Sequence, residues 1–251
     1  MDFYSDDLPP LLDIHEVSRI FMTYIQCELG SGDDGTVYLL GNGLVIKHTY
    51  SVREIALALE IMDYPVRGLP DIYGVYTNSG MIYPDDSDSG YPYKNMFIIR
   101  ENISDICMNR DMHDDFLNVM NGITNRDMSD IIKSKDMMAI EEIKSVFTHA
   151  ENRFIFNEII RTQFDLHART GSVITDIFKL SNLGVAPDGK FVIRDFSRPF
   201  LRSDILQRGA DYNNDVMDIS PEAVRDIVRK KSHHDRAGHG DANIVKPGTD
   251  L

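Results

Sequence analysis

The sequence predicts a two-lobed α+β fold, in which a small antiparallel β lobe precedes a larger and mostly helical lobe. Strand-like runs and turn signals fill residues 24–102, where a single helical segment interrupts them. Helical periodicity then dominates from residue 105 to residue 168, and a second strand–turn–strand segment follows it. We therefore expect an N-terminal extension at 1–23, a β-rich lobe at 24–102, a helical lobe at 103–231 and a flexible tail at 232–251.

The composition is typical of a soluble globular protein with a strongly acidic surface. The chain has 251 residues, enough for one or two domains, and a formal net charge of -14. An acidic surface disfavours contact with nucleic-acid phosphates, so we expect no direct nucleic-acid partner. A decoy that imitates nucleic acid would also be acidic, but acids interleaved with apolar residues are more typical of a solvated surface.

The N-terminus and the cysteines indicate a cytoplasmic protein. The segment from Met1 to Asp7 is acidic and has no basic region, unlike a secretory signal. No apolar run is long enough to span a membrane, so we expect no membrane partner. Cys27 and Cys107 are too few for a disulfide framework, and we expect two reduced, partly buried thiols.

The first lobe begins with a short helix and a β-hairpin. Asp13 and Glu16 can form a capping pair for a helix that ends before residue 24. Residues 36–40 and 44–47 are strand-like and flank Gly41-Asn42-Gly43, which is a strong hairpin signal.

A helix and two further strands complete this lobe. Residues 51–63 have helical periodicity, with one apolar face formed by Ile55, Ala58, Leu59 and Met62. Two strands are expected at 72–77 and 96–100, joined by a polar loop that is rich in Gly, Pro, Asp and Ser over 78–95. The predicted order of elements is β-β-β-α-β-β.

The second lobe combines helices with one hairpin. Its methionines recur at helical spacing and are expected to fill the core: Met108, Met112, Met120, Met128, Met137 and Met138. Strands at 183–185 and 191–193 flank a Pro-Asp-Gly turn, and a helix is expected at 221–231. The histidines of the C-terminal tail have no spaced carboxylate or cysteine that would complete a metal site.

The first motif with chemical content is glycine-rich. Gly30, Gly32, Gly35 and Val37 form the pattern G-x-G-x-x-G-x-V between two strand-like runs. The dinucleotide-binding version of such a motif joins a strand to a helix, whereas the version between two strands closes over the phosphates of a nucleotide. Glycines allow backbone to approach the phosphates without a side-chain clash. The alternative interpretation is a glycine-rich surface hairpin.

The second motif is Val45-Ile46-Lys47, on the strand that follows the first hairpin. A lysine at this place can hold nucleotide phosphates if a carboxylate of the next helix orients it. Glu54 is favoured over Glu60 for this role, because it shares a stripe with Ala58 and Ile61 that can face the sheet. The alternative interpretation is an exposed lysine at the end of a strand.

The third motif brackets the second hairpin. Asp176 and Asn182 precede the hairpin, and Asp195-Phe196-Ser197 follows it. This arrangement resembles the catalytic loop and the D-F-G segment of protein kinases, including the hairpin between Asn182 and Asp195. The alternative interpretation is a hairpin flanked by ordinary turn residues.

The order of these motifs resembles that of the protein-kinase superfamily, over residues 24–231. It is most similar to the small early serine/threonine kinases of lytic podoviruses, the T-odd type of coliphage. The resemblance implies a protein-kinase-like fold with a reduced C-terminal lobe, the use of ATP and Mg²⁺, and protein substrates in the cytoplasm of the host cell. It also implies a capacity for autophosphorylation.

The resemblance assigns a role to each motif. Asp176 would orient and deprotonate the accepting hydroxyl, Lys179 would lie near the transferred phosphoryl group, and Asn182 and Asp195 would hold Mg²⁺. Lys47 and Glu54 would form the pair that holds the phosphates. The residues expected to contact ATP are Gly30, Ser31, Gly32, Gly35, Val37 and Lys47, with main-chain groups near Arg100 and Asn102 at the adenine.

The loop around Asp176 departs from the kinase pattern, which leaves other functions open. Asp176 and Asn182 are one residue further apart than usual, and Ile174-Thr175 replaces the usual His-Arg pair. Asp165 is an alternative base, but no asparagine follows it at the expected distance. The alternatives to a protein kinase are an inactive pseudokinase, an acidic protein that inhibits a host protein, and a small-molecule phosphotransferase of the aminoglycoside phosphotransferase kind.

Overall fold

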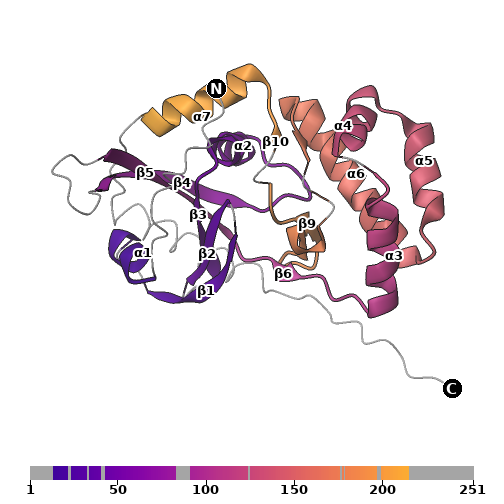
Figure 1. Cartoon of the computed structure of the whole chain (residues 1–251), viewed down its shortest axis with the longest axis horizontal. Coiled ribbons are helices and arrows are strands. Elements are labelled where there is room, and N and C mark those ends of the chain that lie inside the picture. Colours follow the sequence, from indigo (N-terminus) through magenta and orange to yellow (C-terminus); the bar gives the residue numbers. More distant parts are fainter. Residues whose placement is uncertain are drawn as a thin grey trace, which may run out of the picture.

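The computed structural model describes residues 14–21, 24–32, 34–40, 43–82, 91–123, 125–175, 177, 179–196 and 199–214. A β-rich lobe lies at one end of the molecule and a bundle of helices at the other (Figure 1). The predicted two-lobed α+β fold is therefore confirmed. The expected helix at 221–231 and the expected tail at 232–251 lie outside the described residues.

The first lobe is built on a five-stranded antiparallel sheet with the order β1-β2-β3-β5-β4. Its strands are β1 Ile25–Gly32, β2 Gly35–Leu40, β3 Leu44–Thr49, β4 Ile72–Ile82 and β5 Tyr91–Glu101. Helix α2, Val52–Asp63, connects β3 to β4. The predicted order β-β-β-α-β-β is therefore confirmed.

The prediction of a polar loop at 78–95 is wrong over most of that range. Strands β4 and β5 continue to pair through it, from Asn78 opposite Asn95 to Ile82 opposite Tyr91. Strand β3 ends with Thr49 opposite Met96, so beyond this point β5 has β4 as its one neighbour within the sheet. A two-stranded ribbon of this kind tolerates the glycine and proline that suggested a loop.

Two helices cover opposite faces of the sheet. Helix α1, Ile14–Phe21, buries Val17 and Phe21 in a cluster with strand residues that include Phe97. The rings of Phe21 and Phe97 meet edge-on, with 4.9 Å between their centroids. Residues 14–21 therefore pack within the small lobe rather than extending from it. Asp13, the expected cap, lies outside the described residues.

Helix α2 covers the other face and is buried on more than one side. Ser51 caps it, because its hydroxyl accepts the N–H of Glu54. Glu54, Ala58 and Ile61 are all buried, as their shared stripe predicted. Met62 was expected on the apolar face, but it is 39% exposed. Helix α2 packs against both the sheet and a later helix, so its buried residues do not follow one stripe.

The second lobe contains α3 Arg110–Met120, α4 Asn125–Ser134, α5 Met137–Val146 and α6 Ala150–Thr170. Met120 and Met128 are buried in its core, as predicted. Met137 and Met138 are 53% and 85% exposed, which corrects the prediction for them. They begin α5, a helix on the outside of the bundle that buries only Ile140 among its residues.

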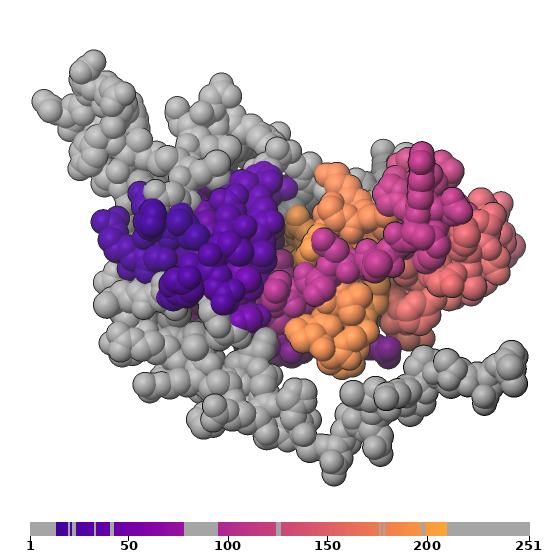
Figure 2. Space-filling model, turned by 90° about the horizontal axis from the view of Figure 1, so that it is seen from below, coloured from indigo at the N-terminus to yellow at the C-terminus, as the bar shows by residue number. Residues whose placement is uncertain are grey.

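Short strands connect the lobes. A 3-10 turn, Leu180–Asn182, leads into the predicted hairpin of β8 Leu183–Val185 and β9 Phe191–Ile193, and β6 Ser104–Asp105 pairs with β8. Strand β7, Val173–Ile174, pairs with β10, Pro199–Phe200. Figure 2 shows this orange hairpin region between the indigo small lobe and the pink helices.

One helix was not predicted. Helix α7, Ser203–Asn214, follows β10 and returns to the small lobe, where it packs across α2 (Figure 1). The small lobe is therefore completed by a segment from the far end of the described chain.

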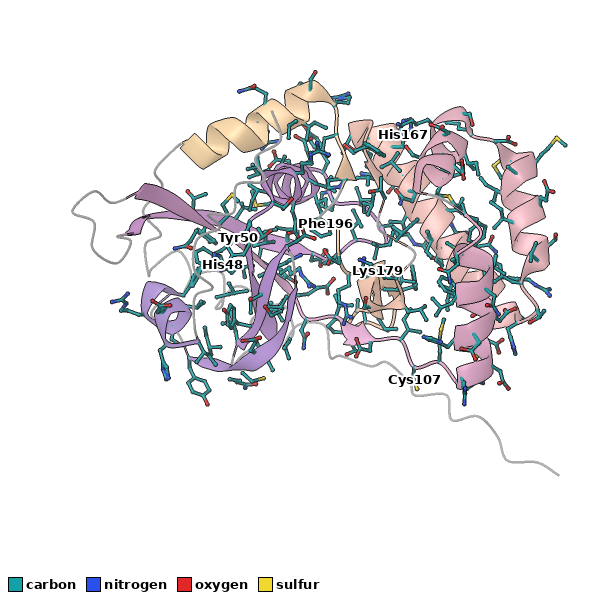
Figure 3. All side chains as sticks on the ribbon, viewed as in Figure 1. His48, Tyr50, Cys107, His167, Lys179 and Phe196 are labelled. Carbon is teal, nitrogen blue, oxygen red and sulfur yellow. The ribbon has the colours of Figure 1, made fainter. Side chains whose placement is uncertain are left out.

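Both cysteines are exposed, which corrects the expectation of partly buried thiols. Cys27 lies on β1, an edge strand whose residues after Ile25 are all exposed. Cys107 lies in the connection before α3 (Figure 3). Within the described residues, none of the helices is both long and apolar enough to cross a membrane.

His48 is a buried base in the small lobe. Its Nε2 lies 3.0 Å from Asn95 Oδ1, and its ring stacks on Phe97 and meets Tyr50 edge-on (Figure 3). Burial lowers the pKa of His48 to about 4, and the hydrogen bond with Asn95 opposes this effect. The ring is therefore neutral in the folded protein at pH 7.

This histidine is expected to make stability depend on pH. Unfolded histidine has a pKa of about 6.5, so between pH 6.5 and 4 the unfolded chain binds a proton that the folded chain does not. The contribution is complete above pH 6.5, and about 2 kcal/mol of it is lost on acidification to pH 4.5. Urea unfolding of His48→Gln, which keeps an amide partner for Asn95, should show a smaller loss between pH 7 and 4.5. An equal loss in both proteins would contradict this account.

Candidate active site

A cleft of about 790 Å³ lies between the two lobes. This volume is within the range of small-molecule sites in proteins. The β1–β2 turn, β3, residues 100–105 and the segments on both sides of the second hairpin line it. All three motifs that the sequence singled out therefore contribute to one cavity.

The glycine motif forms the turn between β1 and β2. Ser31 lies opposite Thr36 and Gly32 opposite Gly35, and all predicted residues of the motif line the cleft, Val37 included. A Cβ atom on Gly30 or Gly32 would meet open space, so ligand contact is a sufficient reason for glycine there. At Gly35, with a φ of 143°, a Cβ would lie 1.9 Å from the carbonyl oxygen of His48, so packing against β3 itself requires glycine.

Lys47 extends from β3 toward two carboxylates. Its Nζ donates to Glu54 Oε1 at 2.7 Å and to Asp195 Oδ1 at 3.0 Å. Thr49 Oγ1 donates to the second oxygen of Glu54 at 2.6 Å. Of the two acids considered for Lys47, the structure places Glu54 against it, whereas Glu60 pairs with Arg208.

The ion pair of Lys47 and Glu54 is buried, so the pKa of each group depends on the charges beside it. Glu54 is 1% exposed and Lys47 is 6% exposed. Burial raises the pKa of the Glu54 carboxyl, and the nearby Asp195 adds to this, while Lys47 and Thr49 oppose it. Burial lowers the pKa of Lys47, but the two carboxylates outweigh burial and the net direction is upward, so Lys47 is a cation.

The second hairpin brings Asn182 and Asp195 together. The carbonyl oxygen of Asn182 accepts the N–H of Arg194 at 2.7 Å and that of Asp195 at 3.3 Å. Arg194 also donates from Nη1 to Asp105 at 2.6 Å and from Nε to the carbonyl oxygen of Ser181 at 2.9 Å. The hairpin between the two residues is therefore closed, and both line the cleft.

Asn182 and Asp195 provide oxygen donors of the kind that Mg²⁺ prefers. In the described part of the chain, no group of three or more His, Cys, Asp or Glu side chains is placed to hold a metal ion. Mg²⁺ in nucleotide sites is commonly held by one or two protein oxygens together with phosphate oxygens and water. A carboxylate and an amide beside Lys47 fit this manner of binding.

The loop before the hairpin is described in part. Lys179 is exposed and lines the cleft (Figure 3), while Asp176 lies outside the described residues. Asp165, the alternative base, lies within α6 and accepts a hydrogen bond from Arg169 Nε at 2.9 Å. It is absent from the described lining of the cleft, so the structure gives it no support as a base.

Helix α6 anchors the strand that leads into this loop. Gln163 is fully buried, and its amide bonds both backbone groups of Ile174. The Nε2 group donates to the carbonyl oxygen at 2.7 Å, and Oε1 accepts the N–H at 3.0 Å. The backbone two residues before Asp176 is therefore fixed by a side chain that the sequence did not single out.

The sequence did not single out three charged residues that line the cleft, Asp34, Asp105 and Arg194. Among the described residues, the cleft is lined by the cationic side chains of Lys47, Arg100, Lys179 and Arg194 and by the carboxylates of Asp34, Asp105 and Asp195. Two of these cations are paired within the cleft, Lys47 with Asp195 and Arg194 with Asp105. The position of Arg194 directly before Asp195 in the sequence was the signal that could have identified Arg194 as a residue of the cleft.

Comparisons with known proteins give distant likenesses. No family model matches the chain, and no curated protein matches it. Its structure is similar to the GDP complex of a mutant aminoglycoside 2'-phosphotransferase, with 12% identity, a TM-score of 0.38 and 86% of each chain covered. It is also similar to the GDP and kanamycin complex of APH(2")-IIIa, with 12% identity, a TM-score of 0.34 and coverage of 90% of this chain and 94% of that chain.

A third similar structure is an aminoglycoside phosphotransferase from Alicyclobacillus acidocaldarius. The identity is 12%, the TM-score is 0.30, and the match covers 90% of this chain and 78% of that chain.

Proposed function

We propose that this chain is a phosphotransferase with a protein-kinase-like fold, which transfers the γ-phosphoryl group of a nucleoside triphosphate to a hydroxyl group. The observation that carries the proposal is the contact of Lys47 with both Glu54 and Asp195 beneath a glycine-rich turn. A buried cation held by two carboxylates at the inner end of a cleft is suited to bind phosphate oxygens.

The two ends of the cleft suit the two ends of a nucleotide. Val45 and Ile103 supply apolar surface for a base near the crossover between the lobes, and Val37 adds apolar surface opposite Lys47. Lys47 and the backbone of the glycine turn supply donors for phosphates. ATP is the donor that the kinase resemblance implies.

In this proposal Asn182 and Asp195 hold Mg²⁺. Bound Mg²⁺ neutralises charge on the phosphates during transfer. The protein contributes by position: Lys47 holds the phosphates, and Glu54 keeps the Lys47 ammonium in place. We assign to Asp176, from the kinase resemblance, the role of orienting the acceptor hydroxyl and taking its proton, and to Lys179 a place beside the transferred group.

The acceptor hydroxyl is proposed from the sequence resemblance. The resemblance to small coliphage kinases supports serine and threonine hydroxyls of host proteins in the host cytoplasm, including those of the enzyme itself. A small-molecule hydroxyl and an inactive pseudokinase are the other outcomes that the experiment distinguishes.

The experiment measures transfer of label from γ-labelled ATP and GTP with Mg²⁺. One set of reactions contains a bacterial lysate and another contains aminoglycosides, each with the wild type, Asp195→Ala and Asp176→Ala. Labelled proteins that disappear with Asp195→Ala support a protein kinase, and labelled aminoglycosides support the small-molecule enzyme. Equal labelling by the wild type and Asp195→Ala would overturn the enzyme proposal. Full activity of Asp176→Ala would overturn the assignment of the base alone.

A further inference from the structure

Arg100 is a buried cation in the wall of the cleft. It is 5% exposed, and it lines the cleft from strand β5. A guanidinium carries five N–H donors, yet within the described residues its one hydrogen bond is from Nη1 to the carbonyl oxygen of Glu101, at 3.3 Å. None of the described carboxylates forms an ion pair with it.

Such a group is costly unless a ligand satisfies it. Burial lowers the pKa of Arg100, while the charges of Glu54 and Asp195 oppose this effect. A buried cation that lacks close partners loses its hydration without full compensation. The donors of Arg100 therefore indicate a ligand that presents acceptor atoms at this point of the cleft.

The position of Arg100 along the sheet identifies which part of a nucleotide it would meet. Lys47 lies opposite Ile98 in the β3–β5 pairing, and Arg100 lies opposite Val45. The backbone of Arg100 is thus displaced from that of Lys47 toward Asn102 and the crossover between the lobes. This is the end of the cleft with apolar walls, where the proposed function places the base.

We propose that Arg100 reads the edge of the base and selects a 6-oxopurine, so that GTP is the preferred phosphoryl donor. Guanine presents two acceptors, O6 and N7, which a guanidinium can engage together, whereas adenine presents an amino donor in place of O6. An adenine at this position would meet the N–H groups of Arg100 with its own N–H group. The inference rests on the proposed function, because it requires that the cleft binds a purine nucleotide.

The test is isothermal titration of GDP, IDP and ADP, each with Mg²⁺, into the full chain. IDP carries the 6-oxo group of GDP without its 2-amino group, so it isolates the contact assigned to Arg100. Wild type is expected to bind GDP and IDP about tenfold more tightly than ADP, within the range for a bidentate arginine–guanine contact. Arg100→Met should lose this advantage while it still binds ADP.

Two further variants keep the test decisive. Arg100→Lys keeps the charge without the planar fork, so selectivity should fall while binding of all three nucleotides persists. Arg110→Met makes the same substitution at a side chain on α3 that is 92% exposed, and should leave all three affinities unchanged. Circular dichroism reports whether each variant is folded.

The outcomes separate this inference from the proposed function. Tighter binding of ADP than of GDP by the wild type would overturn the role of Arg100. So would an unchanged ratio of GDP to ADP affinity in a folded Arg100→Met or Arg100→Lys variant. Failure of the folded wild type to bind any of the three nucleotides would instead overturn the proposed function itself.

Discussion

Replacing Lys47 by methionine is expected to lower the rate of phosphoryl transfer by about 100-fold or more. It is also expected to lower the free energy of unfolding by about 3 kcal/mol. The first effect follows from the loss of the cation that is assigned to the phosphates. The second follows because Glu54, which is 1% exposed, would lose its ion-pair partner. Single-turnover transfer and urea unfolding measure the two effects separately.

A second substitution separates the two roles of this pair. Adding Glu54→Gln to Lys47→Met removes the buried charge and keeps an acceptor for Thr49 Oγ1, which donates to Glu54 at 2.6 Å. The double variant should regain most of the lost stability and none of the lost transfer. Transfer at the wild-type rate by either variant would show that Lys47 does not hold the phosphates.

Replacing Gly209 by alanine is expected to lower the transfer rate about tenfold and the free energy of unfolding by about 1 to 3 kcal/mol. Gly209 lies where α7 packs on α2, and a Cβ atom there would lie 2.5 Å from the Cβ of Ala56 and 3.0 Å from the carbonyl oxygen of Val52. The two helices would have to separate. Because α2 carries Glu54 to Lys47, their separation would disturb the ion pair in the cleft.

The contact between α2 and α7 has ionic support as well. Arg208 donates to Glu60 at 2.8 Å and to Asp63 at 2.6 Å, and both acids belong to α2. Helix α7 thus holds α2 by close packing at Gly209 and by charge at Arg208. In this way a segment that follows the second hairpin sets the position of a helix in the small lobe.

Two controls accompany Gly209→Ala. Adding Ala56→Gly removes the nearest atom in the clash and should restore part of the lost transfer rate. Gln207→Ala alters an exposed residue of the same helix and should leave transfer unchanged. If Gly209→Ala transfers phosphate at the wild-type rate, α7 does not position α2.

The features that the sequence predicted correctly are those set by local pattern. Alternation, the Gly-Asn-Gly turn and helical periodicity identified the β-β-β-α-β-β order, and the stripe shared with Ala58 and Ile61 identified Glu54 as the acid of α2 that faces the sheet. The hairpin between Asn182 and Asp195 was visible from its Pro-Asp-Gly turn. Each of these signals depends on residues that are close in the chain.

The features that escaped prediction depend on distant contacts. Helix α7 is held by pairs such as Arg208 with Glu60, which are 148 residues apart. The extension of β4 and β5 depends on pairing between two polar segments, which composition alone assigns to a loop. Arg100 is buried in the wall of the cleft, whereas its sequence context is that of an ordinary strand end.

The most direct test of the proposed nucleotide cleft is titration of non-hydrolysable GTP and ATP analogues into the wild type and Asp195→Ala, with Mg²⁺ and with a chelator. Wild type should bind, and Mg²⁺ should tighten its binding about tenfold or more, because Asn182 and Asp195 are assigned to the ion. Asp195→Ala should lose the effect of Mg²⁺. Absence of binding to the folded wild type, or the same effect of Mg²⁺ in both proteins, would contradict the proposed cleft.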